Sequence, residues 1–147
     1  MADDLRRPIA AMKTAMQLER CGDLAKNIAK RVGRMAAAAE PSQVSSVVAL
    51  GELAADRLAA VINAFRQGDA QGAYSVWLKD TEIDERHDAV LAEIVAGMTA
   101  DPATVADGTH LLFIAKNLER IGDHATNIAE LVHYQLTGQD LADRPKL

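Results

Sequence analysis

The stretch LERIGDHATNIA at residues 118–129 is a near copy of the stretch LERCGDLAKNIA at residues 18–29. An internal repeat of this kind indicates two copies of one supersecondary unit. The shared letters include Glu, Gly, Asp and Asn, which hydrophobic packing alone would not require at fixed places. The repeat therefore predicts a functional site as well as a fold.

The composition of the chain limits both its fold and its partners. Its 147 residues suffice for one domain with a sizeable core, and 49% hydrophobic with only 3% aromatic residues suits close-packed helices. A net charge of −5 argues against nucleic acid, which binds basic surfaces. The single cysteine, Cys21, excludes an internal disulfide and a Cys-rich zinc site. Without an apolar run long enough to span a bilayer or a basic leader, we expect a cytoplasmic protein.

Helix-breaking residues divide the chain into four long helical stretches. Pro41 interrupts the first helix, and Asp101 followed by Pro102 is a strong start signal for the last. No strand-like alternation is present. We expect helices at residues 4–39, 42–67, 70–96 and 102–136, with Ser42 as an N-cap and with Gly68, Gly97 and Gly138 as helix ends. The predicted fold class is an all-α, antiparallel helical bundle.

Two carboxylates of the repeat share one helical face. Glu119 and Asp123 are four residues apart, and Asn127 extends their row. At about 100° of rotation per residue, they lie roughly opposite the apolar stripe. That stripe comprises Ile114, Leu118, Ile121, Ala125, Ile128 and Val132. The row is therefore expected on a surface of the bundle, which argues against a buried di-metal oxidoreductase with inward Glu and His ligands.

Glu19 and Asp23 form the same row in the first copy. Two interpretations stay open for these rows, a solvated acidic face or a metal site. The acidic pairs repel by a few tenths of a kcal/mol, and Gly22 and Gly122 each cost about 1 kcal/mol relative to Ala inside a helix. A cation held by carboxylate oxygens would reverse the repulsion. The glycines would leave room either for a ligand or for close helix packing.

The helix expected at residues 70–96 supplies a second acidic row. Asp80 and Asp84 are four residues apart; Asp80 and His87 fall within the apolar stripe, and Asp84 lies at its edge. A buried carboxylate needs a partner, for which Arg120, Lys116 or a metal would serve. His87 is either a core residue or, less favoured, a metal ligand.

We predict one metal site formed by Asp80, Asp84, Glu119 and Asp123, with Asn127 as an outer member. Oxygen ligands favour iron, manganese, magnesium or calcium, and zinc is less favoured without a clear His or Cys partner. No nucleophile has a nearby base, so catalysis is not expected.

The first predicted helix carries its own apolar stripe, formed by Leu18, Ala25, Ile28 and Val32. Leaving it in water is unfavourable by about 25 cal/mol per Å². The helix should therefore fold back on the rest of the bundle or pack against another chain, and we favour a homodimer.

These residues together resemble the PhoU family of bacterial regulators of phosphate uptake. Residues 118–130 fit the family's helix motif throughout, and residues 18–29 fit the companion copy. The triplet at residues 4–6 resembles the Asp-Leu-Arg that opens that helix. The pair Asp80 and Asp84 resembles the acidic pair on the middle helix of the family's second unit.

The resemblance implies an organisation in three-helix units. Residues 1–40 would be the last helix of a first unit, residues 42–138 a complete second unit, and residues 139–147 a frayed tail. The resemblance also implies that this chain binds metal clusters at its surface and is not an enzyme. It would then link the ATPase subunit of the phosphate transporter to a membrane sensor histidine kinase, associate only peripherally with the membrane, and repress the phosphate-starvation response. An alternative is a bundle that stores or buffers metal without a signalling partner.

Overall fold

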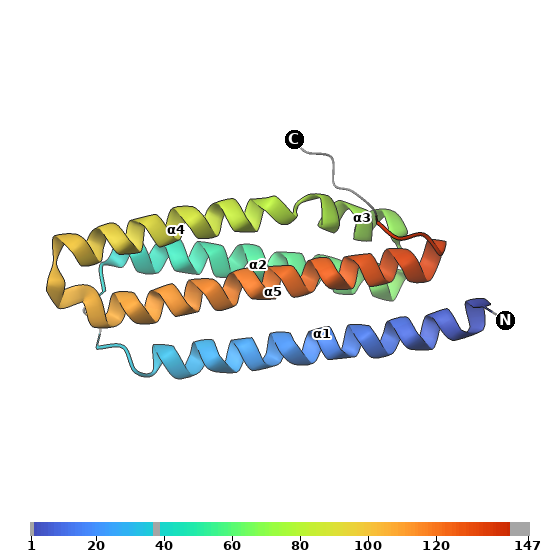
Figure 1. Cartoon of the computed structure of the whole chain (residues 1–147), viewed down its shortest axis with the longest axis horizontal. Helices are drawn as coiled ribbons and strands as arrows, with labels where there is room; N and C mark the ends of the chain where they lie inside the picture. Colours follow the sequence, from blue (N-terminus) through green and yellow to red (C-terminus); the bar gives the residue numbers. More distant parts are fainter. Residues whose placement is uncertain (1, 37–38, 142–147) are drawn as a thin grey trace.

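The computed structural model describes residues 2–36 and 39–141, and this part of the chain contains helices and turns but no strand. Four long helices lie along a common direction (Figure 1). They are α1 (Ala2–Val32), α2 (Pro41–Gln67), α4 (Asp80–Ala100) and α5 (Val105–Thr137). A short α3 (Ala70–Leu78) precedes α4, and the 3₁₀ turn η1 (Pro102–Thr104) precedes α5. The predicted all-α bundle is confirmed, and the tail expected at residues 139–147 lies largely outside the described residues.

Several predicted helix ends are found in the structure. Gly68 and Gly138 end α2 and α5 in the left-handed conformation, with φ of 66° and 72°. The Asp101 carboxylate accepts a hydrogen bond from the Ala103 amide at 3.0 Å and so caps η1. Ser42 is not the N-cap of α2, because Pro41 already occupies the first turn and Glu40 takes the cap position.

Other predicted boundaries are wrong for identifiable reasons. The helix expected at residues 70–96 is interrupted at Lys79 and continues to Ala100. Gly97 does not end it, because this glycine lies inside the helix where a Cβ would collide with the Gln43 side chain. The first helix ends at Val32 instead of residue 39, and the Ala36 amide beyond it donates to Asp107 Oδ1 at 2.9 Å.

The helix α5 is the centre of the bundle. The helices α2, α3 and α4 pack on it to form the core, and α1 lies along it on another side (Figure 1). The predicted α5 stripe is confirmed, since its members are buried except for the half-buried Leu118. Leu50, Ile83 and Ile94 fill one end of the core, and Val61 and Trp77 fill the other.

The helix α1 folds back along α5 in the antiparallel direction (Figure 1). Its buried residues are Ala10, Thr14, Cys21 and Leu24. The apolar stripe predicted for this helix is therefore wrong, because a different side of α1 packs against the bundle. Of the predicted residues, Leu18, Ala25 and Val32 are exposed and only Ile28 is half-buried. Among the described residues, no helix is both long and apolar enough to cross a membrane.

Candidate metal centre

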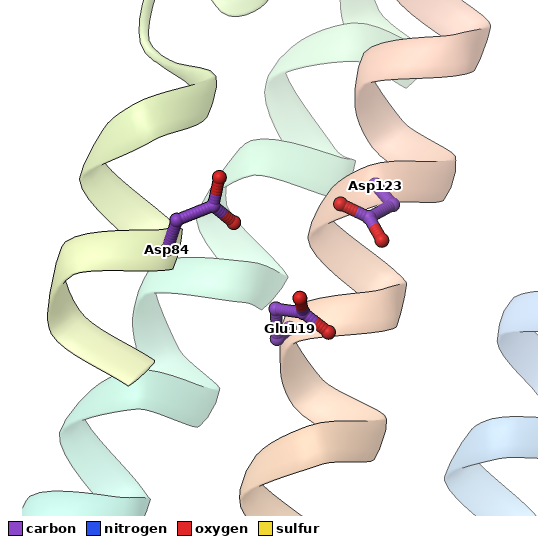
Figure 2. Close-up of side chains that lie close together, drawn as sticks. All are labelled: Asp84, Glu119 and Asp123. Carbon is purple, nitrogen blue, oxygen red and sulfur yellow. The ribbon is translucent and has the colours of Figure 1, made fainter. Parts of the chain in front are cut away.

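Three carboxylates converge at the seam between α4 and α5. Asp84 comes from α4, and Glu119 and Asp123 come from α5. Each offers one oxygen within 4.8 Å of those offered by the other two (Figure 2). This three-carboxylate group (Asp84, Glu119 and Asp123) has the oxygen-only chemistry that hard cations prefer.

Gly122 allows the two helices to approach each other at this point. A Cβ at Gly122 would lie 2.6 Å from Ile83 Cδ1 and 3.1 Å from its Cγ2, closer than side chains tolerate. Of the two roles considered for the glycine, close helix packing is the one observed. Because Ile83 precedes Asp84 and Gly122 precedes Asp123, this contact places the two carboxylates opposite each other.

Asp80 borders the three-carboxylate group without belonging to it. Its half-buried carboxylate accepts a hydrogen bond from the Thr126 hydroxyl at 2.5 Å. Thr126, one turn beyond Asp123, was not among the residues predicted from the sequence. Its spacing alone would have pointed to it, because a hydroxyl three residues after Asp123 shares that face of the helix. Asp80 therefore adds negative charge one turn from the group.

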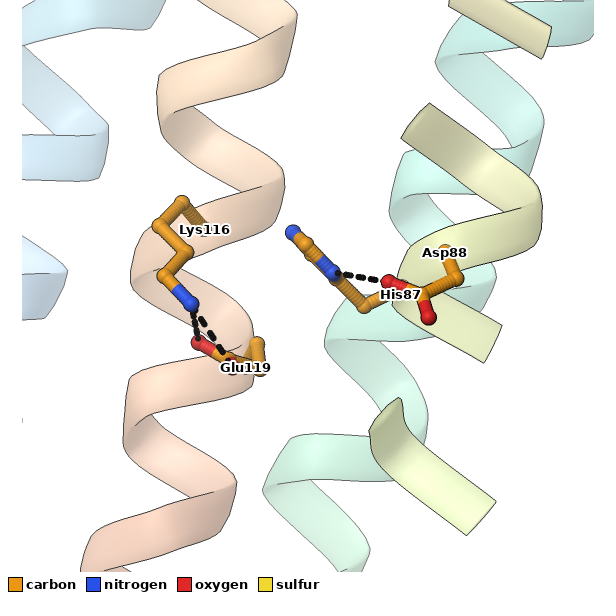
Figure 3. Close-up of polar contacts among 4 residues, drawn as sticks. All are labelled: His87, Asp88, Lys116 and Glu119. Carbon is orange, nitrogen blue, oxygen red and sulfur yellow. Dashed lines mark hydrogen bonds and ion pairs between the residues drawn. The ribbon is translucent and has the colours of Figure 1, made fainter. Parts of the chain in front are cut away.

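The position of Glu119 opposite the apolar stripe predicted an exposed side chain. In the structure the Glu119 side chain is only 14% exposed. Lys116 compensates its charge, with Nζ 2.7 Å from a Glu119 oxygen (Figure 3). Lys116 thus pairs with Glu119 in the structure, although the sequence offered it as a partner for Asp80. The lysine side chain is 55% exposed, so it can move into water if a cation takes its place.

Asp123 experiences the accumulated negative charge of the seam. Partial desolvation of this surface carboxyl raises its pKa, and the charges of Glu119, Asp80 and Asp84 raise that pKa further, while Lys116 opposes them. A bound cation would offset the negative charge that Lys116 alone does not balance.

His87 lies beside the three-carboxylate group as a buried side chain of α4. Its Nδ1 is 3.3 Å from Asp88 Oδ1 (Figure 3), and its Nε2 has no hydrogen-bond partner within the described part of the chain. His87 is not part of the group that could share an ion. The candidate ligand set is therefore made of oxygen atoms alone.

The remaining candidates from the repeat lie elsewhere. Glu19 and Asp23 are exposed on α1 and, among the described residues, join no group of three side chains able to hold an ion. Gly22 differs from its counterpart Gly122, because no atom of another helix lies within 4 Å of where its Cβ would be. Asn127 donates a hydrogen bond to Gln17 Oε1 of α1 at 3.3 Å, so its amide is engaged with α1 in this structure.

A protein family and several named proteins are similar to this chain in sequence. The model of the PhoU domain family matches residues 1–32 and 47–132. The phosphate-specific transport system accessory protein PhoU homolog of Caulobacter vibrioides is 50% identical over all of this chain and 65% of its own length. The homolog of Rhizobium meliloti is 43% identical over 99% of this chain and 62% of its own length.

Solved structures agree with these relatives. PhoU from Pseudomonas aeruginosa superposes with a TM-score of 0.90 at 34% identity, over 95% of this chain and 67% of that one. The phosphate transport system regulatory protein PhoU from Streptococcus pneumoniae gives 0.85 at 33% identity, over 97% and 68%. This chain thus spans about two-thirds of the length of its relatives, and it belongs to the PhoU family.

Proposed function

We propose that this chain is a metal-binding adaptor that restrains phosphate uptake and represses the phosphate-starvation response. It would link the ATPase subunit of a phosphate transporter to a membrane sensor histidine kinase, without catalysing a reaction. Relatives with 50% and 43% identity are named accessory proteins of phosphate-specific transport, and these names support the transport connection. The protein would act at the inner face of the membrane, where both partners expose domains.

The observation that carries the metal part of this proposal is the three-carboxylate group itself. Asp84 and Asp123 are exposed, so a bound ion would shape the outer surface of the bundle instead of its interior. Such an ion would hold α4 against α5 and present a charged docking feature to a partner. Iron, manganese, magnesium and calcium fit the oxygen ligands best, and zinc fits less well.

A metal-storing bundle is the competing function. A store needs many sites per chain, whereas the described residues contain one group of three possible ligands. This count favours the adaptor. Binding to a purified transporter ATPase, measured together with the number of metal ions per chain, separates the two. Several ions per chain and no binding to the ATPase would establish the store.

The metal site is tested by removing two of its ligands. We expect the Asp84→Ala, Asp123→Ala double variant to lose its metal after extensive dialysis, as measured by elemental analysis. Glu52 and Asp56 provide a matched control, because they are an exposed acidic pair four residues apart on α2. Equal metal content in the wild type, the double variant and the Glu52→Ala, Asp56→Ala control would show that the three-carboxylate group does not hold metal.

The regulatory role is tested in the host. Deleting the gene should switch on phosphate-starvation genes in phosphate-rich medium, and the intact gene should restore repression. The Asp84→Ala, Asp123→Ala variant should restore it poorly if the ion takes part in docking. Normal repression in the deletion strain, with no paralogue present, would refute the role.

A further inference from the structure

A second polar site lies between α1 and α5, apart from the three-carboxylate group. It is a pocket of about 290 Å³, and none of the three carboxylates lines it. Four cationic side chains do line it: Arg20, Lys26 and Lys30 from α1 and Arg120 from α5. Only one acidic residue, Asp23, faces them. This surplus of positive charge belongs to a chain whose net charge is −5.

The antiparallel packing of the two repeat copies creates this concentration of charge. Arg20 and Arg120 occupy the same position in the two copies, and both line the one pocket. Both also lower the pKa of His124, after the larger effect of its burial, so both guanidinium groups lie within electrostatic range of that imidazole. Two like charges held near each other repel, and an anion bound between them would offset that repulsion.

The four cations have no partner in the described part of the chain. Elsewhere, Lys116 pairs with Glu119 and Arg57 with Glu82. For Arg20, Lys26, Lys30 and Arg120, by contrast, the described residues provide neither an ion pair nor a hydrogen bond. Each arginine therefore keeps five N–H donors, in a planar fork that matches the oxygens of a phosphate or carboxylate.

We propose that this pocket binds inorganic phosphate between Arg20 and Arg120. The two guanidinium groups would each donate to phosphate oxygens, and Lys26 and Lys30 would add charge at the rim. The pocket lies just below the roughly 300–1,000 Å³ typical of small-molecule sites, which suits a compact anion. A solvated basic surface is the alternative. We favour a bound anion because the lining contains four cationic side chains and only one acidic residue.

Asp23 gives the pocket a means of selecting its anion. At neutral pH inorganic phosphate retains a proton, which a carboxylate can accept as a hydrogen bond. Sulfate has no such proton and would be repelled by the carboxylate. A phosphomonoester carries a charge of about −1.5 to −2 at pH 7, so it too would mostly lack the proton. The site should therefore prefer free phosphate to both.

The proposal goes beyond the proposed function, because it requires neither the metal nor a protein partner. Isothermal titration of phosphate into the intact chain, in excess chelator and low salt, tests it directly. We expect the Arg20→Gln, Arg120→Gln variant to bind phosphate at least tenfold more weakly than the wild type. The exposed residues Lys79 and Arg86 provide the control, since Lys79→Gln with Arg86→Gln removes the same charge outside the pocket.

Equal binding by the wild type, the pocket variant and the control variant, all with native circular dichroism, would overturn the proposal. A wild-type chain that shows no heat of binding when phosphate is titrated into it would also overturn the proposal. The Asp84→Asn, Asp123→Asn variant should bind phosphate like the wild type in chelator. Loss of metal binding with retained phosphate binding therefore separates this site from the metal centre.

Competing anions test the role of Asp23. The wild type should bind sulfate at least tenfold more weakly than phosphate, and Asp23→Asn should narrow that difference. Similar affinities of the wild type for the two anions would overturn the selective role of Asp23. Tighter binding of a phosphomonoester such as AMP would overturn the assignment to free phosphate and identify the phosphoryl group of a larger molecule as the ligand.

Discussion

Two glycines at the same place in the repeat have different surroundings, and this gives a matched pair of substitutions. Gly122→Ala should lower the free energy of unfolding by about 1–3 kcal/mol, because the new methyl group would meet Ile83 and push α4 from α5. Gly22→Ala should raise it by about 0.5–1 kcal/mol, since the position is open and Ala favours helix. Urea unfolding followed by circular dichroism measures both. Changes of the same sign at the two positions would contradict this account.

Asp123 links the candidate site to stability. The pKa of the Asp123 carboxyl is raised in the folded state. The free energy of unfolding therefore falls as the pH rises from the ordinary pKa of Asp through the raised value. Without metal, Asp123→Asn should therefore be more stable than the wild type at pH 7, by about 0.5 kcal/mol, the scale of like-charge repulsion on a helix. Its advantage should disappear at a pH below the ordinary range of Asp.

Thermal unfolding in chelator at several pH values measures this difference. Asp56→Asn, at an exposed position of α2, controls for the loss of one negative charge. A less stable Asp123→Asn at neutral pH would mean that the acidic seam stabilises the metal-free protein.

At the scale of the elements, the sequence predicted whether a helix exists better than where it ends. Helix ends that depend on one residue's own backbone were predicted correctly. At Gly138, for example, the left-handed conformation of the glycine itself ends the helix. Gly97 was misinterpreted because its role is to admit the Gln43 side chain from α2, and that contact is absent from local sequence. The same limit applies at the site. Spacing placed Glu119 and Asp123 on one face, but only the approach of α4 through Gly122 explains why Asp84 joins them.

The contact of α1 with α5 can be followed through Cys21, the only thiol in the chain. Cys21 is 5% exposed, and burial raises the pKa of its thiol, so reactive thiolate is scarce while α1 is docked. Leu24→Ala should loosen α1, because truncating a buried Leu costs about 2–5 kcal/mol. We expect its Cys21 to react at least tenfold faster with a thiol reagent. Leu91→Ala, on the exposed side of α4, should leave the rate unchanged.

For the whole molecule, the outer side of α1 bears on the number of chains that associate. Leu5, Ile9, Met12 and Met16 recur at helical spacing, and Met12 and Met16 are 69% and 60% exposed. Exposed apolar surface of this kind favours association at about 25 cal/mol per Å². We therefore predict a homodimer that buries this face of α1.

Sedimentation equilibrium measures that prediction. Met12→Lys with Met16→Lys should shift the chain from dimer to monomer. Ala55→Lys with Ala59→Lys, an exposed pair of the same spacing on α2, should leave it dimeric. A monomeric wild type at high concentration would refute the prediction.

The antiparallel contact between α1 and α5 also has a consequence for ancestry. Gln17 lies opposite His124, and Ala36 lies opposite Asp107. With the repeat offset of one hundred, this register places Cys21 opposite Ile121, its own counterpart, and the two share one apolar cluster. Each copy therefore meets the other as the halves of a two-fold symmetric dimer would. A gene encoding one unit could have specified such a pair of separate chains, and its duplication and fusion would have turned a contact between molecules into one within a molecule.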